Sequence, residues 1–380
     1  MRFDLTEEQK LLVDTVTRFL GKELPSTALR PWFRQASGDQ YRAWWNRCGT
    51  LGWGGIFAPP GHGEHGPVSD VPLVDASLLA EAAGAALAPS GLVGTSAAVA
   101  ALAADPELGH PALPGLLDCS TVAALALEEP GGVWELKELM TTARVDGAEL
   151  VIDGMKVLVA DAATADLFLV ACRVSDGVGL ALVPSSSPGV SAIDLAGLDL
   201  LRQYGTLRLD EVRVPREALI GRADPARILQ LATCLQLAET TGSLDKLFHL
   251  MLEYTRSRYA FGRPIGSFQA LKHRIADILL WVEGCKGTVE AAVAAVADQS
   301  PDSDLLVSVA KAYVGERSIE IGQQCTQIFG GIGFTWEHDA HLHLRRATTS
   351  RSVLGTPEQH RARVARLLDV KGEKRGDNGS

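Results

Sequence analysis

The spacing of apolar residues changes twice along the chain and divides it into three parts. Between residues 6 and 20 the apolar positions recur with helical periodicity, and Thr6 followed by Glu8 is typical of a helix N-cap. Alanine- and leucine-rich helical patterns return at 72–87 and 92–102. We therefore predict that residues 1–117 form an N-terminal helical domain.

Strand patterns replace the helical ones from residue 118. Short runs rich in apolar and β-branched residues alternate with turn signals, at 150–159, 167–171, 179–183 and 205–209. The Asp153-Gly154 pair predicts a tight turn that joins two antiparallel strands as a hairpin. Residues 118–218 are therefore expected to form a compact β domain, a small barrel or sandwich.

Helical periodicity resumes at Ala226 and continues to the end of the ordered chain. Long helices are predicted over 226–254, 267–298, 303–328 and 357–369. These segments make residues 219–370 a C-terminal domain of the four-helix-bundle type. The tail, 371–380, is charged and glycine-rich, so we expect it to be disordered. The predicted fold class is α+β, with the β domain between two helical domains.

Composition narrows the classes of function. The 380 residues are 46% hydrophobic, enough for several packed domains, and a net charge of −10 disfavours nucleic acid as a partner. The apolar run Ala85–Ala104 is broken by proline and glycine, so no membrane insertion is expected. The N-terminus lacks a signal-peptide pattern, which predicts a cytoplasmic protein. The six scattered cysteines favour buried, reduced thiols.

Two motifs carry a specific resemblance to a known family. The segment Arg258-Tyr-Ala-Phe261-Gly-Arg-Pro-Ile-Gly-Ser-Phe-Gln269 resembles the Arg-x-x-Phe-Gly-x-x-Ile-x-x-x-Gln motif of acyl-CoA dehydrogenases. Further along, Gln327-Ile-Phe-Gly330-Gly331-Ile-Gly-Phe resembles the Gln-x-x-Gly-Gly-x-Gly-Phe motif of the same family. Weaker matches extend the resemblance over nearly the whole chain, at Glu129-Pro130-Gly131, at Gly154-Met-Lys156 and at Leu209–Pro215.

The resemblance implies an FAD site shared between subunits. An FAD pyrophosphate needs arginine donors and close backbone approach at glycine, and its ring needs a flat apolar wall. By resemblance, FAD of a neighbouring subunit is contacted by Arg258, Phe261 and Gln269, and its dinucleotide part is lined by Gln327, Gly330 and Gly331. Thr356 touches the pyrophosphate of the chain's own flavin. Taken singly, an arginine is more often a surface residue, and Thr356 before Pro357 is more often a helix N-cap.

The implied reaction needs a carboxylate base, and the sequence places none at the family's positions. The family removes an α-proton from an acyl-CoA thioester while the β-hydrogen leaves as hydride to the flavin. The usual glutamate position is Leu354, and the alternative position is Ala232. Glu239 lies seven residues later, roughly 10.5 Å along nearly the same helix face, and is the candidate catalytic base. The alternative is that Glu239 pairs with a lysine or arginine of a neighbouring helix.

The predicted β domain also departs from the family beside the flavin ring. Glu128 and Trp134 stand where the family has threonine and serine, and Leu158-Val-Ala160 replaces a Trp-x-Thr pattern. These changes predict weaker or different flavin contacts. They are typical of a subunit with a degraded pocket that still lends its Arg258 motif to a partner.

The sequence leaves several hypotheses open. The leading one is an oxidoreductase that dehydrogenates an acyl-CoA-type thioester, either alone with Glu239 as base or within a mixed oligomer. The implied assembly is a homo- or hetero-oligomer, a dimer or tetramer, with an electron-transfer flavoprotein or similar acceptor. The rival is a catalytically silent structural subunit that completes a partner's FAD site, and a third is a flavin monooxygenase on the same fold.

Two polar clusters near the C-terminus are expected to play no part in catalysis. The spacing of His338, His341 and His343 matches no metal site, so no metal is predicted. Arginines are frequent from Arg345 to Arg366, which is compatible with an anionic ligand, although a solvated helix face is the simpler interpretation.

Overall fold

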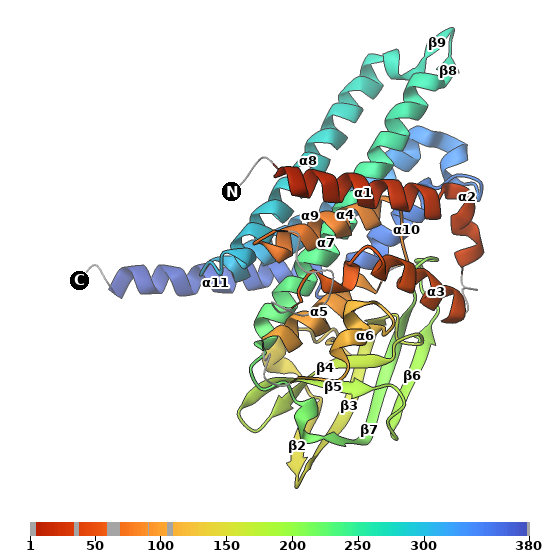
Figure 1. Ribbon diagram of the computed structural model, residues 1–380. Helices are drawn as coiled ribbons and strands as arrows, with labels where there is room; N and C mark the ends of the chain where they lie inside the picture. Colours follow the sequence, from red (N-terminus) through yellow and green to blue (C-terminus); the bar gives the residue numbers. More distant parts are fainter. Residues whose placement is uncertain (1–4, 34–37, 59–68, 90, 105–108, 378–380) are drawn as a thin grey trace.

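The computed structural model describes residues 5–33, 38–58, 69–89, 91–104 and 109–377. Figure 1 shows the strands of the β domain gathered at one end of the molecule and two long helices, α7 (Pro225–Ser257) and α8 (Gln269–Ala297), extending to the other. The N-terminal helices lie against the middle of this pair. The predicted order of a helical, a β and a second helical domain is confirmed.

The N-terminal domain is helical, as its apolar periodicity predicts. Helix α1 (Glu7–Glu23) begins at a capping box, in which the Thr6 side chain accepts a hydrogen bond from Gln9 N–H and the Gln9 side chain accepts one from Thr6 N–H. The remaining helices of this domain are α2 (Ser26–Leu29), η1 (Arg30–Trp32), α3 (Gly38–Gly49), η2 (Trp53–Gly55), α4 (Pro72–Ala85), α5 (Leu92–Ala103) and α6 (Leu113–Leu117).

The β domain is a seven-stranded sheet with the order β1-β4-β2-β3-β7-β6, in which β5 pairs with β4. Its strands are β1 (Ala123–Ala126), β2 (Thr142–Asp146), β3 (Glu149–Ala160), β4 (Leu167–Val174), β5 (Gly177–Pro184), β6 (Val190–Leu195) and β7 (Tyr204–Pro215). The short helices η4 (Leu136–Glu138) and η5 (Arg216–Ala218) lie between and after them.

The predicted hairpin turn at Asp153-Gly154 is wrong. Strand β3 runs through both residues, and its pairing with β7 shifts register between Ile152 and Gly154, which is a β-bulge. Gly154 has φ +152°, and a Cβ there would lie 2.5 Å from Thr141 Oγ1. Glycine is thus required by a close approach inside the sheet.

The C-terminal domain is built on α7, α8 and α9 (Ser303–Phe329), with α10 (Ala340–Ser350) and α11 (Pro357–Asp377) packed on α9. A two-stranded hairpin, β8 (Tyr259–Ala260) and β9 (Arg263–Pro264), then η6 (Ile265–Ser267), connects α7 to α8, and η7 (Gly330–Phe334) follows α9. Helix α11 continues to Asp377, so residues 371–377, expected to be disordered, are helical; 378–380 lie outside the described residues.

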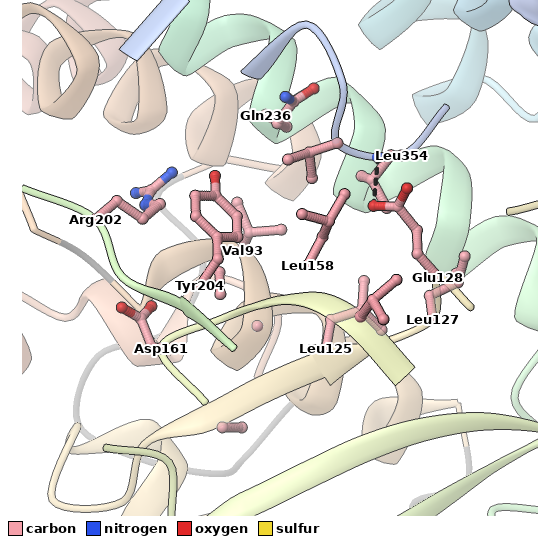
Figure 2. Close-up of a pocket in the computed structure, with 15 residues that line it drawn as sticks. Val93, Leu125, Leu127, Glu128, Leu158, Asp161, Arg202, Tyr204, Gln236 and Leu354 are labelled. Carbon is pink, nitrogen blue, oxygen red and sulfur yellow. Dashed lines mark hydrogen bonds between the residues drawn. The ribbon is translucent and has the colours of Figure 1, made fainter. Parts of the chain in front are cut away.

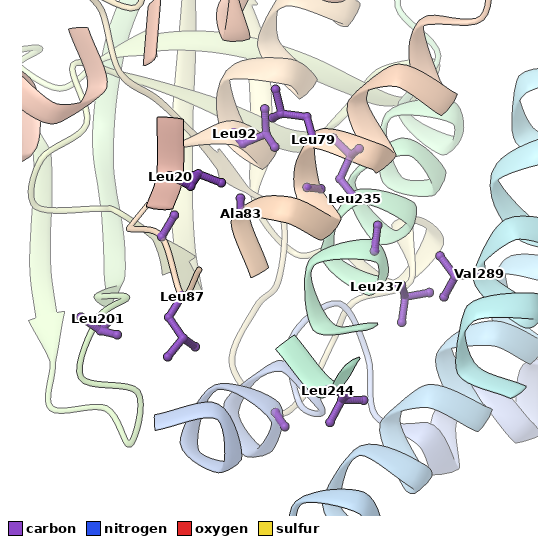
Figure 3. Packing of buried hydrophobic residues seen from close by; sticks show 14 of the residues in the cluster. Leu20, Leu79, Ala83, Leu87, Leu92, Leu201, Leu235, Leu237, Leu244 and Val289 are labelled. Carbon is purple, nitrogen blue, oxygen red and sulfur yellow. The ribbon is translucent and has the colours of Figure 1, made fainter. Parts of the chain in front are cut away.

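One apolar core joins the two helical domains. Figure 3 shows Leu79 and Ala83 of α4 near Leu235 of α7, with Leu20 of α1 and Val289 of α8 in the same cluster. All six cysteines are buried and unpaired, as expected.

Helices α4 and α7 touch backbone to backbone through two glycines. A Cβ at Gly84 would lie 1.8 Å from the carbonyl oxygen of Glu239, and a Cβ at Gly242 would lie 1.9 Å from that of Glu81. Only glycine allows this approach. The contact fixes the part of α7 that carries Glu239.

Candidate active site

A narrow cavity lies between the β domain, α5, α7 and the segment 351–356 that joins α10 to α11. About 50 Å³ of it is open to water. Figure 2 shows Glu128 on one side with its carboxyl group directed at Leu354, and Arg202, Tyr204 and Asp161 on the other, with leucine side chains between them. Its walls also include Val93, Leu125, Leu127, Leu158, Gln236 and Val353.

A buried ion pair fixes the backbone that leads into this cavity from β1. Lys156 Nζ donates to Glu129 Oε1 at 2.8 Å and to the carbonyl oxygen of Leu127 at 3.0 Å, and neither charged side chain is more than 3% exposed. The Glu129 carboxylate also accepts from the backbone N–H groups of Met140 and Thr141. The family-like Glu129 and Lys156 therefore hold the turn that places Glu128.

Glu128 lines the cavity, and its carboxyl group is shielded from solvent. It is 6% exposed, and Oε1 accepts a hydrogen bond from Leu354 N–H at 2.7 Å. Burial raises the pKa of Glu128 to about 7, opposed by the Leu354 N–H and the nearby Lys311. Burial likewise lowers the pKa of Lys311 to about 7. Lys311 Nζ donates to Gln236 Oε1 and to the Ser350 carbonyl oxygen, both at 2.8 Å.

Leu354, at the family's position for the base, faces this cavity as an apolar wall. It is 5% exposed and has φ +58°, a left-handed conformation that costs a non-glycine residue about 1–3 kcal/mol. Its carbonyl oxygen lies 2.9 Å from His360 Nε2, and burial lowers the pKa of His360 to about 3, so the ring is neutral and donates. The alternative base position, Ala232, is fully buried.

Glu239 is held by arginines and does not line the cavity. Its carboxylate accepts from Arg202 Nη1 at 2.5 Å, from Arg202 Nη2 at 2.7 Å and from Arg346 Nη1 at 2.9 Å. Arg346 also pairs with Asp199. Glu239 is 3% exposed, and its oxygens face guanidinium groups. The structure therefore has the pairing with an arginine of a neighbouring helix that the sequence left as the alternative.

Sequence reasoning missed the partners of Glu239. Arg346 belongs to the arginine-rich segment that was expected to be a solvated face, yet it is fully buried. Asp199 and Arg202 come from the loop between β6 and β7, far from α7 in the chain. The one available signal was a carboxylate in an otherwise apolar helix, which requires a partner without naming it.

The motif residues Arg258, Phe261 and Gln269 lie at the tip of the α7–α8 pair, near β8 and β9 in Figure 1. All three are exposed, and Phe261 is 95% exposed with φ +52°. The Phe261 ring meets the edge of Phe268, which in turn stacks under the Arg263 guanidinium. None of the three lines the cavity of this chain.

The second motif ends α9 and also faces outward. Gln327 and Gly331 are exposed, and Gly330 has φ +64°, which ends the helix at a conformation that favours glycine. Thr356 instead caps α11. Its Oγ1 accepts from Gln359 N–H at 3.3 Å, while Thr356 N–H donates to Gln359 Oε1 at 2.8 Å.

The space beside Gly355, next to the cavity, is filled by the side chains of Trp134 and His360. Trp134 is 2% exposed and stacks on His360 with ring centroids 4.2 Å apart. A Cβ at Gly355 would lie 2.7 Å from the indole of Trp134. Known small-molecule pockets measure about 300–1,000 Å³. The three-ring isoalloxazine of FAD does not fit the residues and the space present here.

The three histidines of the sequence cluster, His338, His341 and His343, each contact a different residue. His343 Nδ1 lies 2.8 Å from Ser243 Oγ, His338 Nδ1 accepts from Ala340 N–H at 3.1 Å, and the His341 ring packs edge-on against Trp336. Within the described ranges, no group of three potential metal ligands comes together.

The part of the chain that the structure describes holds no helix with both the length and the apolar character needed to cross a bilayer.

Comparisons with known proteins agree with this architecture. The chain matches the models described as the N-terminal, middle and C-terminal domains of acyl-CoA dehydrogenase, over residues 6–117, 124–212 and 225–368. It is 30% identical to acyl-CoA dehydrogenase IpdE2 of Mycobacterium tuberculosis over 93% of this chain and 95% of the relative. It is 28% identical to cyclohexane-1-carbonyl-CoA dehydrogenase of Geobacter metallireducens, over 69% of this chain and 72% of that protein.

Among solved structures, the ChsE4-ChsE5 complex from Mycobacterium tuberculosis contains a chain that superimposes with a TM-score of 0.85. The two chains are 25% identical, and the match covers 97% of this chain and 99% of the other. A steroid acyl-CoA dehydrogenase, Tcur3481-Tcur3483, gives the same TM-score at 27% identity, with coverage of 97% and 99%. The chain therefore belongs to the acyl-CoA dehydrogenase family of enzymes.

Proposed function

We propose that this chain acts in the FAD-dependent α,β-dehydrogenation of an acyl-CoA-type thioester as one subunit of a mixed oligomer. In this assembly it completes the FAD site of a partner chain. The observation that carries the proposal is the contrast between its two flavin-related regions. Phe261, in the motif that would contact the partner's FAD, is 95% exposed. Leu354, at the family's position for the catalytic glutamate, is 5% exposed beside a cavity of about 50 Å³.

The exposed tip supports the lending role. An aromatic side chain that is almost fully exposed gains nothing from folding, so its apolar surface is available to a ligand or a partner. Arg258 supplies a guanidinium beside it, which suits a pyrophosphate through paired charge-assisted hydrogen bonds. Gln327 and Gly331 are likewise exposed. The reduced partner flavin would pass its electrons to an electron-transfer flavoprotein or similar acceptor.

The buried residues of the chain support the proposal that the catalytic base comes from the partner chain. Leu354 and Ala232 cannot accept a proton, and the oxygens of Glu239 are engaged by Arg202 and Arg346. A carboxylate must come within about 3 Å of the substrate's α-proton to act on it. Glu239 is outside the cavity lining, so we assign it a structural role in this chain. The base and the substrate pocket would then belong to the partner.

A mixed assembly also has a precedent among similar structures, because the ChsE4-ChsE5 structure is a complex. The first test is to co-express the chain with the dehydrogenase-like chains encoded beside its gene and to measure the native mass of what co-purifies. The proposal expects a complex of two different chains that contains FAD. The isolated chain should be colourless, and a yellow isolated chain that bleaches with an acyl-CoA would contradict the proposal.

The sharper test is Arg258→Ala in the mixed complex. Loss of a hydrogen bond to a charged group costs about 1.5–3 kcal/mol, so FAD should bind roughly 10- to 150-fold more weakly. The measurement is flavin released on dilution, per complex. Arg256→Ala is the matched control, since Arg256 is an exposed arginine two positions away, outside the motif. Equal flavin retention in both variants would refute the role of Arg258.

A further inference from the structure

Three buried side chains hold the segment 351–356 and the residue before it in place beside the cavity. Glu128 accepts from Leu354 N–H at 2.7 Å, His360 Nε2 lies 2.9 Å from the Leu354 carbonyl oxygen, and Lys311 Nζ lies 2.8 Å from that of Ser350. The three side chains are 6%, 0% and 1% exposed. Opening the segment would break all three contacts and cost buried polar atoms such as Glu128 Oε1 and His360 Nε2 these partners, which resists the motion.

Trp134 packs against the same segment at Gly355. Its indole packs on the backbone at Gly355 and stacks on His360 at an interplanar angle of 30°, while the Arg363 guanidinium lies 5.4 Å from its ring centroid. Gly355 has φ +89° and leaves no room for a side chain between its backbone and the indole. The indole, the imidazole and the segment thus form one close-packed stack.

Glu128 and Trp134 are both larger than the residues that the family has beside the flavin ring. The sequence resemblance places a threonine and a serine at these positions. Glu128 is bound to the segment that carries Leu354, and Trp134 lies under the following residue. The remaining cavity, about 50 Å³, is lined mainly by leucines and other apolar side chains. Both side chains therefore contact the same six-residue segment, Glu128 at Leu354 and Trp134 at Gly355.

We propose that Glu128 and Trp134 form a built-in plug that closes this chain's own flavin pocket, so that the chain carries no FAD of its own. Glu128 ties the segment 351–356 down through the Leu354 amide, and Trp134 occupies volume that a cofactor ring would need. Together these two residues determine that the pocket does not bind FAD.

The plug also determines what kind of partner the chain requires, and this step rests on the proposed function. In a symmetric oligomer of identical chains, every exposed tip would meet the same plugged pocket. Such an assembly would have no site for FAD. The partner must therefore be a different chain whose pocket is open, and a second copy of this chain cannot replace it.

The test is the double variant Glu128→Thr, Trp134→Ser in the isolated chain, incubated with excess FAD and passed through gel filtration. The wild-type chain is expected to retain no flavin, and the double variant to retain it in proportion to chain concentration. The matched control is Glu138→Thr, Trp281→Ser, which removes the same residue types away from the cavity. Stoichiometric FAD on the wild-type chain, or a folded double variant without flavin, would overturn the proposal.

A second measurement decides the question if the double variant does not fold. In the wild-type chain, the amides of residues 353–355 should exchange slowly with deuterated solvent, at the same rate with and without FAD. Fast exchange, or slower exchange on addition of FAD, would contradict the plug. Because these experiments use the isolated chain, their failure is distinguishable from a failure of the Arg258→Ala test in the mixed complex.

Discussion

At the scale of single residues, the buried charged cluster contributes to the stability of the fold rather than to catalysis. Its members are Glu239, Arg202, Arg346 and Asp199. Each of its members is 6% exposed or less, and the carboxylates and guanidinium groups pair with one another. A buried ion pair contributes little over an apolar alternative, but removing one partner leaves an uncompensated charge. Glu239 should therefore matter to the fold even if it takes no part in proton transfer.

We expect Glu239→Gln to destabilise the isolated chain by about 3–5 kcal/mol, because Arg202 and Arg346 both lose the charge of Glu239 and Arg346 keeps only its pair with Asp199. Urea denaturation followed by circular dichroism measures this loss. Glu253→Gln on the exposed side of α7 serves as the control and should change the free energy of unfolding little. An unchanged stability in Glu239→Gln would argue against the structural role and revive the candidate base.

The residue scale also marks the limit of prediction from sequence. Leu354 and Ala232 could be identified as lacking a carboxylate because they lie at fixed offsets from specific motifs. The partners of Glu239 could not be found in this way, since Arg202 lies 37 positions before it and Arg346 lies 107 after it. No local pattern distinguishes a buried arginine from a solvated one when its carboxylate comes from a distant segment.

At the scale of secondary-structure elements, the glycine contact between α4 and α7 determines how the N-terminal domain sits on the C-terminal one. Gly84 and Gly242 each place the neighbouring helix backbone closer than any side chain would allow. Gly84 faces the Glu239 carbonyl, so the same contact orients the buried charged cluster.

Gly84→Ala should separate the two helices and cost about 1–3 kcal/mol through overpacking. Thermal unfolding of the variant measures the cost as a lowered Tm. Gly287→Ala in α8 is the matched control, because a Cβ there meets no atom within 4 Å. That control should raise stability by about 0.5–1 kcal/mol, since glycine is unfavourable inside a helix. Equal effects in the two variants would contradict the close contact.

Elements with a sustained period were predictable, whereas a local turn signal was not. The helix predicted over 303–328 is observed as Ser303–Phe329, because its periodicity extends over many turns. Asp153-Gly154 has the composition of a hairpin turn, yet β3 continues through it, and the extra residue of the register shift lies on β7. Whether the chain turns or continues as a strand is decided by the pairing of β3 with β7, which lies some fifty positions later. A local sequence pattern holds no information about this pairing.

At the scale of the whole molecule, the exposed tip of the α7–α8 pair can be changed without loss of stability. We therefore expect a substitution there to affect assembly with the partner chain and not the stability of the isolated chain. Phe261→Asp removes almost no buried surface, because the ring is 95% exposed, and aspartate tolerates its left-handed φ of +52°. The isolated variant should keep its Tm but fail to co-purify with the partner chain. Leu11→Asp, at a 63% exposed site on α1, is the control and should still assemble. A variant of Phe261 that still forms the mixed complex would contradict the docking role of the tip.

The three-domain order was predictable from the two changes of period, but the shape of the cavity was not. Its closure depends on Glu128, Trp134 and the segment 351–356 coming together from the β domain and the last loop. The sequence marks Glu128, Trp134 and Leu354 as departures from the family, but it does not show that the three come together. Only their packing reveals the missing space.

The buried charged cluster has a consequence for how the molecule comes apart. The β6–β7 loop contributes Asp199 and Arg202, α7 contributes Glu239, and α10 contributes Arg346, while Arg42 of α3 pairs with Asp166 beside β4. If the β domain and the C-terminal helices were to separate, buried charges would lose their partners in both of them, and this penalty opposes such a partial opening. The β domain and the C-terminal helical domain are therefore bound into a single cooperative unit, which persists or is lost as a whole.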